Sequence, residues 1–190
     1  MPNHPEIKEL SPRDPLFRQL TEDIELARMA LSQTGRQRPA LVLYRYQPRS
    51  TDSVFGFSSH FSLPYDTVAS LNRVESSVTE MGTGTILVPN QPGLFVPETP
   101  RSELERMMAG VSEAQRVGGE RVLIAGEDDS IEAFWFFPGE LFTSIERSFF
   151  LRIVFRYPPC RRPDDLVLRH PAQSYHGPGP LSRGSRSRGS

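Results

Sequence analysis

The side chains able to act as metal ligands or nucleophiles are few in this 190-residue chain and lie far apart. A single cysteine, Cys160, allows neither an internal disulfide nor a multi-cysteine metal cluster. His170 and His176 are close in sequence but have no carboxylate at ligand spacing, and His4 and His60 stand alone. A zinc site needs three protein ligands held in place. We therefore expect no metal site and no cofactor.

Sequence motifs of catalysis are also missing. Asp128–Asp129 and Asp164–Asp165 are paired acids in polar surroundings, which are more typical of turns than of general acid/base pairs. The glycines of Gly82–Gly84 lack the G-K-[ST] ending and the following helix of a phosphate-binding loop. The chain contains no G-x-S-x-G elbow of a serine hydrolase.

Charge and hydropathy give no support for two classes of partner. The net charge is −1, which gives no general argument for binding nucleic acid or a membrane surface. No apolar run approaches the roughly 20 residues of a membrane span. The first ten residues lack the basic and apolar regions of a secretory signal, so we expect no export signal in this sequence.

The last 33 residues differ from the rest in composition. Residues 158–190 contain six arginines and two aspartates, a local charge of +4, and have no Phe, Ile, Lys or Glu. Such a segment buries too little apolar surface to offset its ordering entropy, so we predict a disordered tail. A solvated tail is the preferred interpretation, and an Arg/Ser/Gly tail that binds nucleic acid is the alternative.

The remaining chain has the pattern of an α+β protein with short elements. Apolar residues spaced by three and four predict a helix over about 14–32 (Leu16, Leu20, Ile24, Ala27, Leu31). Capping-box spacings predict helices that begin near Ser102, with Glu105, and at Thr143, with Glu146. Strands are predicted at 41–46, 85–89, 121–125, 132–137 and 152–157. The aromatic run 134–137 favours core strand, although Trp135 could stack on a sugar if it faces outward.

The segment between the first two predicted strands has the pattern of two short helices. Val54, Phe57, Ser58 and Phe61 form one stripe of a two-turn helix that Thr51 or Asp52 can cap. Pro64 can begin the second helix, in which Val68 and Leu71 point inward. Asn72 then ends that helix, because asparagine tolerates the left-handed conformation and bonds local backbone, and Val74 returns to the core. The whole forms a compact βααβ unit.

Residues 42–90 resemble a LysM domain, the carbohydrate-binding module of cell-wall proteins. The alternative is an unrelated βααβ segment with a similar core. The resemblance rests on these residues: Tyr44, Tyr46, Thr51–Val54, Phe57, Ser58, Phe61, Leu63, Val68, Asn72, Val74 and the closing ILVP.

The resemblance implies that the unit binds chains of N-acetylglucosamine-type sugars in a shallow groove between two loops, 51–55 and about 77–84. Main-chain amides and carbonyls do most of the binding in such a groove, and Asp52 is expected to serve as a cap rather than a ligand. The expected glycan-binding residues are Thr51, Asp52, Ser53, Phe55, Val78, Thr79, Met81 and Gly82.

The segments NQPGLFVP and FWFFPGELFTSIERSFFLRIVFRYP resemble the region that links LysM to a lysostaphin-type zinc endopeptidase domain in envelope proteins, spirochaete versions among them. That peptidase holds zinc with an H-x-x-x-D and an H-x-H motif, and this sequence contains neither. We therefore expect no enzyme activity. The tail after residue 157 could be an out-of-frame remnant of the peptidase domain, which the other two reading frames would show, or the natural end of a short protein.

The predicted organisation has four parts: an N-terminal helical extension at 1–40, the LysM-like domain at 41–91, a mixed α/β linking segment at 92–157 and the tail at 158–190. The expected function is non-catalytic binding of peptidoglycan, as a truncated or degenerate cell-wall endopeptidase in the periplasm or cell envelope of a bacterium. The alternative is a protein–protein interaction module without a glycan ligand.

Overall fold

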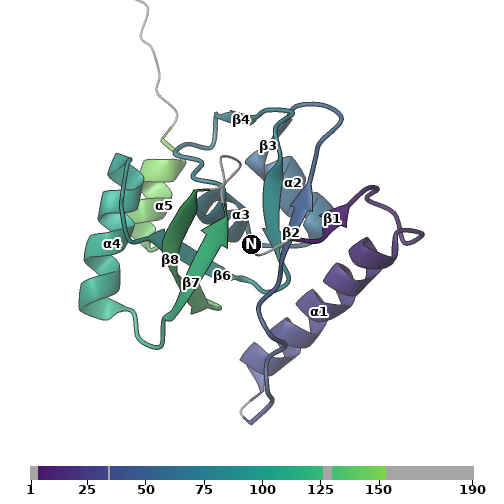
Figure 1. Ribbon diagram of the computed structural model, residues 1–190. Coiled ribbons are helices and arrows are strands. Elements are labelled where there is room, and N and C mark those ends of the chain that lie inside the picture. Colours follow the sequence, from purple (N-terminus) through teal and green to yellow (C-terminus); the bar gives the residue numbers. More distant parts are fainter. Residues whose placement is uncertain (1–3, 34, 126–129, 153–190) are drawn as a thin grey trace, which may run out of the picture. The chain divides into compact units, whose positions relative to one another are not determined.

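The computed structural model of the protein describes residues 4–33, 35–125 and 130–152 and confirms a mixed α+β fold (Figure 1). The predicted strand at 152–157 reaches past the last described residue, and the predicted tail at 158–190 lies outside the described residues. The elements, in chain order, are β1 (Glu6–Ile7), α1 (Pro15–Ser32), β2 (Leu43–Tyr46), β3 (Asp52–Ser53), α2 (Val54–Phe61), α3 (Tyr65–Leu71), β4 (Glu80–Met81), β5 (Ile86–Pro89), β6 (Gly93–Pro97), α4 (Glu103–Gln115), β7 (Glu120–Ala125), β8 (Ile131–Pro138) and α5 (Ser144–Phe150).

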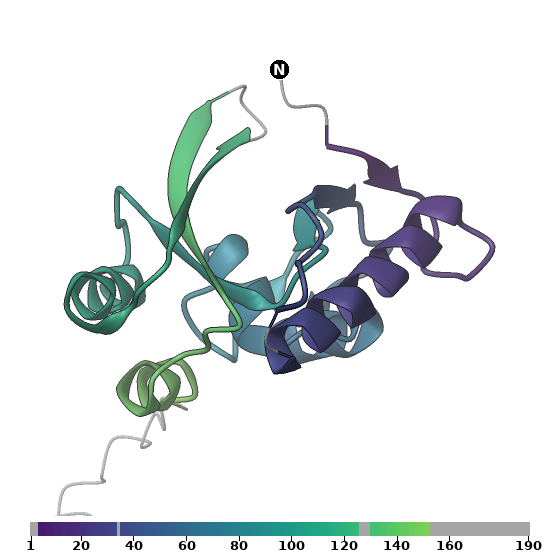
Figure 2. The ribbon, with the colours of Figure 1, turned by 90° about the horizontal axis from the view of Figure 1, so that it is seen from below.

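The strands form three small sheets. In the first, β1 is parallel to β2, and β2 is antiparallel to β5 with Leu43 opposite Pro89 and Tyr46 opposite Ile86. The two-residue strands β3 and β4 pair with each other, and an antiparallel sheet has the order β6-β8-β7. Figure 2 shows α4 and α5 side by side next to β6 and β8.

The predicted βααβ unit is present between β2 and β5. On α2 the side chains of Val54, Phe57 and Phe61 are buried, as the helical stripe predicts, and Val68 of α3 joins them. These residues share a core with Tyr44 and the two alternate β5 residues, Ile86 and Val88. The same core contains residues of α1, β6, α4 and α5, so packing crosses the positions 40/41 and 91/92 that the sequence suggested as boundaries.

Two details of the predicted caps are wrong. Ser53, not Thr51 or Asp52, caps α2, since the Gly56 N–H donates to Ser53 Oγ at 3.1 Å. The Asp52 carboxylate instead accepts the Ser53 N–H at 2.7 Å. Asn72 is the C-cap of α3, as predicted, but its φ is −96°, and the left-handed conformation belongs to the next residue, Arg73, with φ 54°. Asn72 does bond local backbone and Val74 is buried, as predicted.

Helix α3 covers the free edge of β6 with hydroxyl groups. The Gly93 N–H donates to Thr67 Oγ1 at 3.0 Å, and the Phe95 N–H donates to Ser70 Oγ at 3.1 Å. Hydroxyls three residues apart on a helix lie on one face, so they can meet two N–H groups on the same side of a strand. This pairing explains two buried polar residues and blocks further strand addition at this edge. Sequence patterns did not reveal β6, which was expected only as part of a linking segment.

The capping boxes at Ser102/Glu105 and Thr143/Glu146 are both formed as predicted, at the start of α4 and α5. On α1, Leu20, Ile24 and Ala27 are buried, but Leu31 of the same stripe is 41% exposed. No helix within the described ranges combines the length and apolarity needed to cross a bilayer.

Asp14 joins the start of α1 to the segment after β1. Its carboxylate accepts four main-chain N–H groups, from Leu16 and Phe17 at 2.8 and 3.2 Å and from Lys8 and Glu9 at 2.9 and 3.1 Å. Burial alone would raise the pKa of Asp14, but these hydrogen bonds outweigh it and hold the pKa below its usual 3.8.

We expect Asp14→Asn to lower the free energy of unfolding by about 1 kcal/mol at pH 7, because the amide presents a donor to two N–H groups. A lowered folded-state pKa stabilises the protein above the unfolded pKa, and this contribution disappears as the pH falls through the folded value. The difference from wild type should therefore shrink between pH 5 and pH 2 in urea unfolding experiments, to be run at several pH values.

Asp66→Asn is the matched comparison, because the pKa of Asp66 is shifted in the opposite direction to that of Asp14. Burial raises the pKa of Asp66, so the wild-type residue stabilises the protein more as the pH falls. On acidification, the stability advantage of wild type over Asp14→Asn should therefore shrink, and the stability of wild type relative to Asp66→Asn should increase. The same trend at both positions would contradict the assignment of these two carboxylates.

Candidate functional site

The two loops that the sequence singled out are adjacent in the structure. Strands β3 and β4 form a short antiparallel ladder that places Asp52 opposite Met81 and Ser53 opposite Glu80. The first loop leads from β2 into α2, and the second leads from α3 to β5. Since β2 and β5 are themselves paired, both loops emerge at the same end of the βααβ unit.

The eight expected glycan-binding residues differ in their accessibility. Five are exposed: Thr51, Phe55, Val78, Thr79 and Gly82. Asp52 and Ser53 are half-buried, and Met81 belongs to the core with 6% of its surface exposed.

Several of these side chains already have partners within the protein. Ser53 caps α2, and the Asp52 carboxylate lies 3.4 Å from Nε2 of His60. The ring of Phe55 meets the edge of Tyr65 with 5.1 Å between the ring centres, yet 41% of Phe55 is exposed. Phe55 and Val78, which is 63% exposed, are thus the apolar surfaces available in this group.

A groove of about 260 Å³ runs beside the second loop. Gly82 and Gly84 line it together with Thr79, Thr85 and the Asn72–Val74 turn. Glycines in a groove wall leave main-chain N–H and C=O groups open to a ligand, which is the kind of surface that binds amide-bearing sugars through the backbone.

Arg73 lies between this groove and a second one of about 400 Å³. Its guanidinium donates to Glu105 Oε1 at 2.8 Å and to Glu132 Oε2 at 3.1 Å, and it lies 5.1 Å from the centre of the Phe134 ring. Only 17% of the Arg73 side chain is exposed. The sequence did not point to Arg73, because its two carboxylate partners lie 32 and 59 residues away.

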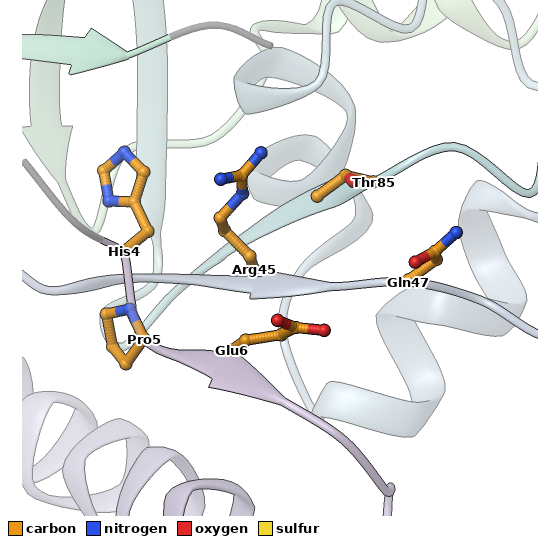
Figure 3. A pocket seen from close by; sticks show the side chains of 6 residues that line it. All are labelled: His4, Pro5, Glu6, Arg45, Gln47 and Thr85. Atoms are coloured by element: carbon orange, nitrogen blue, oxygen red, sulfur yellow. The ribbon is translucent and has the colours of Figure 1, made fainter.

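A third hollow, of about 450 Å³, lies against the β1-β2 side of the first sheet (Figure 3). It is lined by His4, Pro5, Glu6, Arg45, Gln47 and Thr85. Burial and then the neighbouring Arg45 guanidinium lower the pKa of His4, against a backbone hydrogen bond at Leu43 that raises it. The lowered pKa favours the neutral form of the His4 imidazole.

The three hollows meet at Thr85, which lines all of them, and Arg45 lines both the second and the third. Trp135, a candidate sugar platform if it faced outward, is 39% exposed, whereas the neighbouring phenylalanines of β8 are buried. It does not line any of the three hollows.

No group of three His, Cys, Asp or Glu side chains within the described ranges could hold a metal ion. Asp128–Asp129, Asp164–Asp165, His170 and His176 lie outside those ranges. No family model, curated protein or solved structure matched the chain in the comparisons with known proteins.

Proposed function

We propose that the protein binds N-acetylglucosamine-containing glycan, above all the glycan strands of peptidoglycan, through the LysM-like unit. The observation that supports this most is the β3–β4 ladder, which holds the two candidate loops together at one end of a βααβ unit. In a LysM-type site these are the two loops between which the sugar chain lies.

The groove along the second loop would hold the sugar chain. Main-chain groups at Gly82 and Gly84 would pair with acetamido groups, and the exposed Phe55 and Val78 would contact the apolar faces of sugar rings. Ser53 and Met81 would support the loops from behind, because one caps α2 and the other is part of the core. The role is one of binding without catalysis, in a protein of the cell envelope.

Gly82→Val tests the groove directly. A Cβ at Gly82 would meet only Gly84 N, at 4.0 Å, so the variant should fold normally while its branched side chain fills the groove wall. Retention on purified peptidoglycan, with chitin oligomers as competitor, should fall at least about tenfold, the effect of losing roughly 1.4 kcal/mol of binding.

Gly110→Val is the matched control. Gly110 lies on α4, and a Cβ there meets nothing within 4 Å. This variant should bind peptidoglycan like wild type. If wild type is retained by neither peptidoglycan nor chitin, glycan binding is refuted. If Gly82→Val is retained as fully as wild type, this groove is excluded as the binding site.

A protein–protein interaction module is the second candidate, and one surface favours it. On the face of the β7–β8 pair, Leu123 is 52%, Ile131 66% and Trp135 39% exposed, and the pairing register brings them together in a stripe. Contiguous exposed apolar side chains are typical of interaction surfaces. If Leu123→Asp abolished binding to cell-wall preparations while Gly82→Val did not, this second candidate would replace the first.

A further inference from the structure

The hollow of about 450 Å³ that His4 and Arg45 line is called the His4–Arg45 hollow below. Its charged side chains form no ion pair with one another. Glu6 and Arg45 are partners in the β1–β2 ladder, yet no ion pair within 4 Å joins either of them to another described residue. His4 Nε2 is buried without a hydrogen-bond partner in the described part of the chain. Figure 3 shows Arg45 directed away from its strand, between His4 and Thr85.

Other charged groups nearby are paired, which makes this hollow different. Arg73 is bound by Glu105 and Glu132, and Arg101 is bound by Glu132 at 2.5 Å. The carboxylate of Glu132 is thus used twice. Arg45 lines this hollow and also the hollow of about 400 Å³ that Arg73 and Arg101 line, but it forms no ion pair with a carboxylate among the residues that the structure describes.

We infer that the His4–Arg45 hollow binds the peptide part of peptidoglycan, with the Arg45 guanidinium on a peptide carboxylate and the Glu6 carboxylate on a peptide ammonium group. The inference rests on the proposed function and extends it from the sugar chain to its peptide substituents. A ligand with a single charge would satisfy only one of the two side chains, whereas a peptide end with both charges satisfies both.

The position of the hollow agrees with such a ligand. Thr85 belongs both to this hollow and to the groove beside Gly82, so a sugar chain in the groove would carry its peptides toward Arg45. Gln47 and Thr85 add an amide and a hydroxyl that can bond peptide groups. Nε2 of His4, which has no hydrogen-bond partner among the described residues, can bond a further peptide group.

The test compares the full-length protein on two preparations of the same peptidoglycan, one intact and one from which an amidase has removed the peptides. Wild type should bind the intact wall at least about threefold more tightly, as expected for partly exposed charge pairs. Arg45→Gln and Glu6→Gln should each reduce this preference, and the double variant should bind both preparations equally. Arg18→Gln, an exposed change on α1, should keep the preference.

Equal binding of wild type to both preparations would overturn the inference while leaving glycan binding intact. So would a preference that survives in the double variant. Failure to bind either preparation, or chitin hexamer, would instead refute the proposed function and the inference with it. Stronger binding of Glu6→Gln to the intact wall would also overturn the inference, since a ligand with only negative charge would then be in the hollow.

Discussion

Arg116→Ala is expected to lower the free energy of unfolding by about 3–5 kcal/mol, the largest stability change predicted for a single polar side chain in this protein. The Arg116 and Glu146 side chains are only 3% and 0% exposed, and Arg116 Nη2 donates to both Glu146 oxygens at 2.9 and 2.7 Å. Without the guanidinium, Glu146 would be a buried charge with no counter-ion.

The same pair connects two helices, which adds to the expected loss. Arg116 Nη1 donates to the Met108 carbonyl and to Ser112 Oγ, both at 2.9 Å, and so folds back onto α4. Glu146 accepts the Thr143 N–H at 2.6 Å as part of the capping box of α5. Removing Arg116 therefore takes one donor from the Met108 carbonyl, which keeps the Ser112 hydroxyl at 2.7 Å, and leaves Glu146 with the Thr143 N–H but without a cation.

The prediction is measured by urea unfolding of three variants. Arg18→Ala, which breaks the exposed Arg18–Glu22 pair, should change stability by less than about 0.5 kcal/mol. Arg116→Met combined with Glu146→Gln should recover part of the loss of Arg116→Ala, because no buried charge is left uncompensated. A loss below about 1 kcal/mol for Arg116→Ala would show that water compensates Glu146 and that the pair does not hold the two helices.

The capping boxes illustrate which parts of this fold the sequence could predict. The Ser102/Glu105 and Thr143/Glu146 spacings located the starts of α4 and α5, because a capping box is a local pattern. In both boxes the glutamate also binds an arginine, 32 residues away for Glu105 and 30 for Glu146. Nothing local to the glutamates indicates those arginines, so the ion pairs that fasten the helices were not predictable.

The strands show the same division between local and distant determinants. The strands at 41–46, 85–89, 121–125 and 132–137 were found from runs of β-branched and aromatic residues. Strands of two residues such as β1, β3 and β4 carry no periodic pattern, and their pairing depends on partners far along the chain. The loops of the candidate site were located in sequence, but their ladder and the hollow at Arg45 could not be.

The prediction of the residue that caps α2 was wrong for a subtler reason. Thr51, Asp52 and Ser53 all have side-chain oxygens that can cap a helix, so composition left the exact start open. The β3–β4 ladder includes Ser53 and places it at the cap position. A tertiary contact therefore decided between three locally equivalent residues.

Asn72→Leu is expected to lower the free energy of unfolding by about 2–3 kcal/mol, the second-largest effect. The Asn72 amide behaves like one residue of an additional strand beside β5. Its Nδ2 donates to the Leu87 and Val68 carbonyls, both at 2.9 Å, and its Oδ1 accepts the Leu87 N–H at 2.8 Å. Leucine has as many side-chain heavy atoms as asparagine but removes the partner of the Leu87 N–H and carbonyl, while the Val68 carbonyl keeps the main-chain N–H of residue 72 at 3.2 Å.

The change should also weaken glycan binding, because Asn72 and the left-handed Arg73 form one wall of the groove beside Gly82. Gln19→Leu is the matched control: it removes an exposed amide that bonds Asp23 at 2.8 Å and should shift stability by less than about 0.5 kcal/mol. Gly82→Val blocks the groove without touching these hydrogen bonds. Comparing the two variants therefore separates the effect of filling the groove from the effect of losing the hydrogen bonds that position its wall. If Asn72→Leu kept both stability and binding, apolar packing alone would hold α3 against β5, and the amide would have no part in shaping the groove.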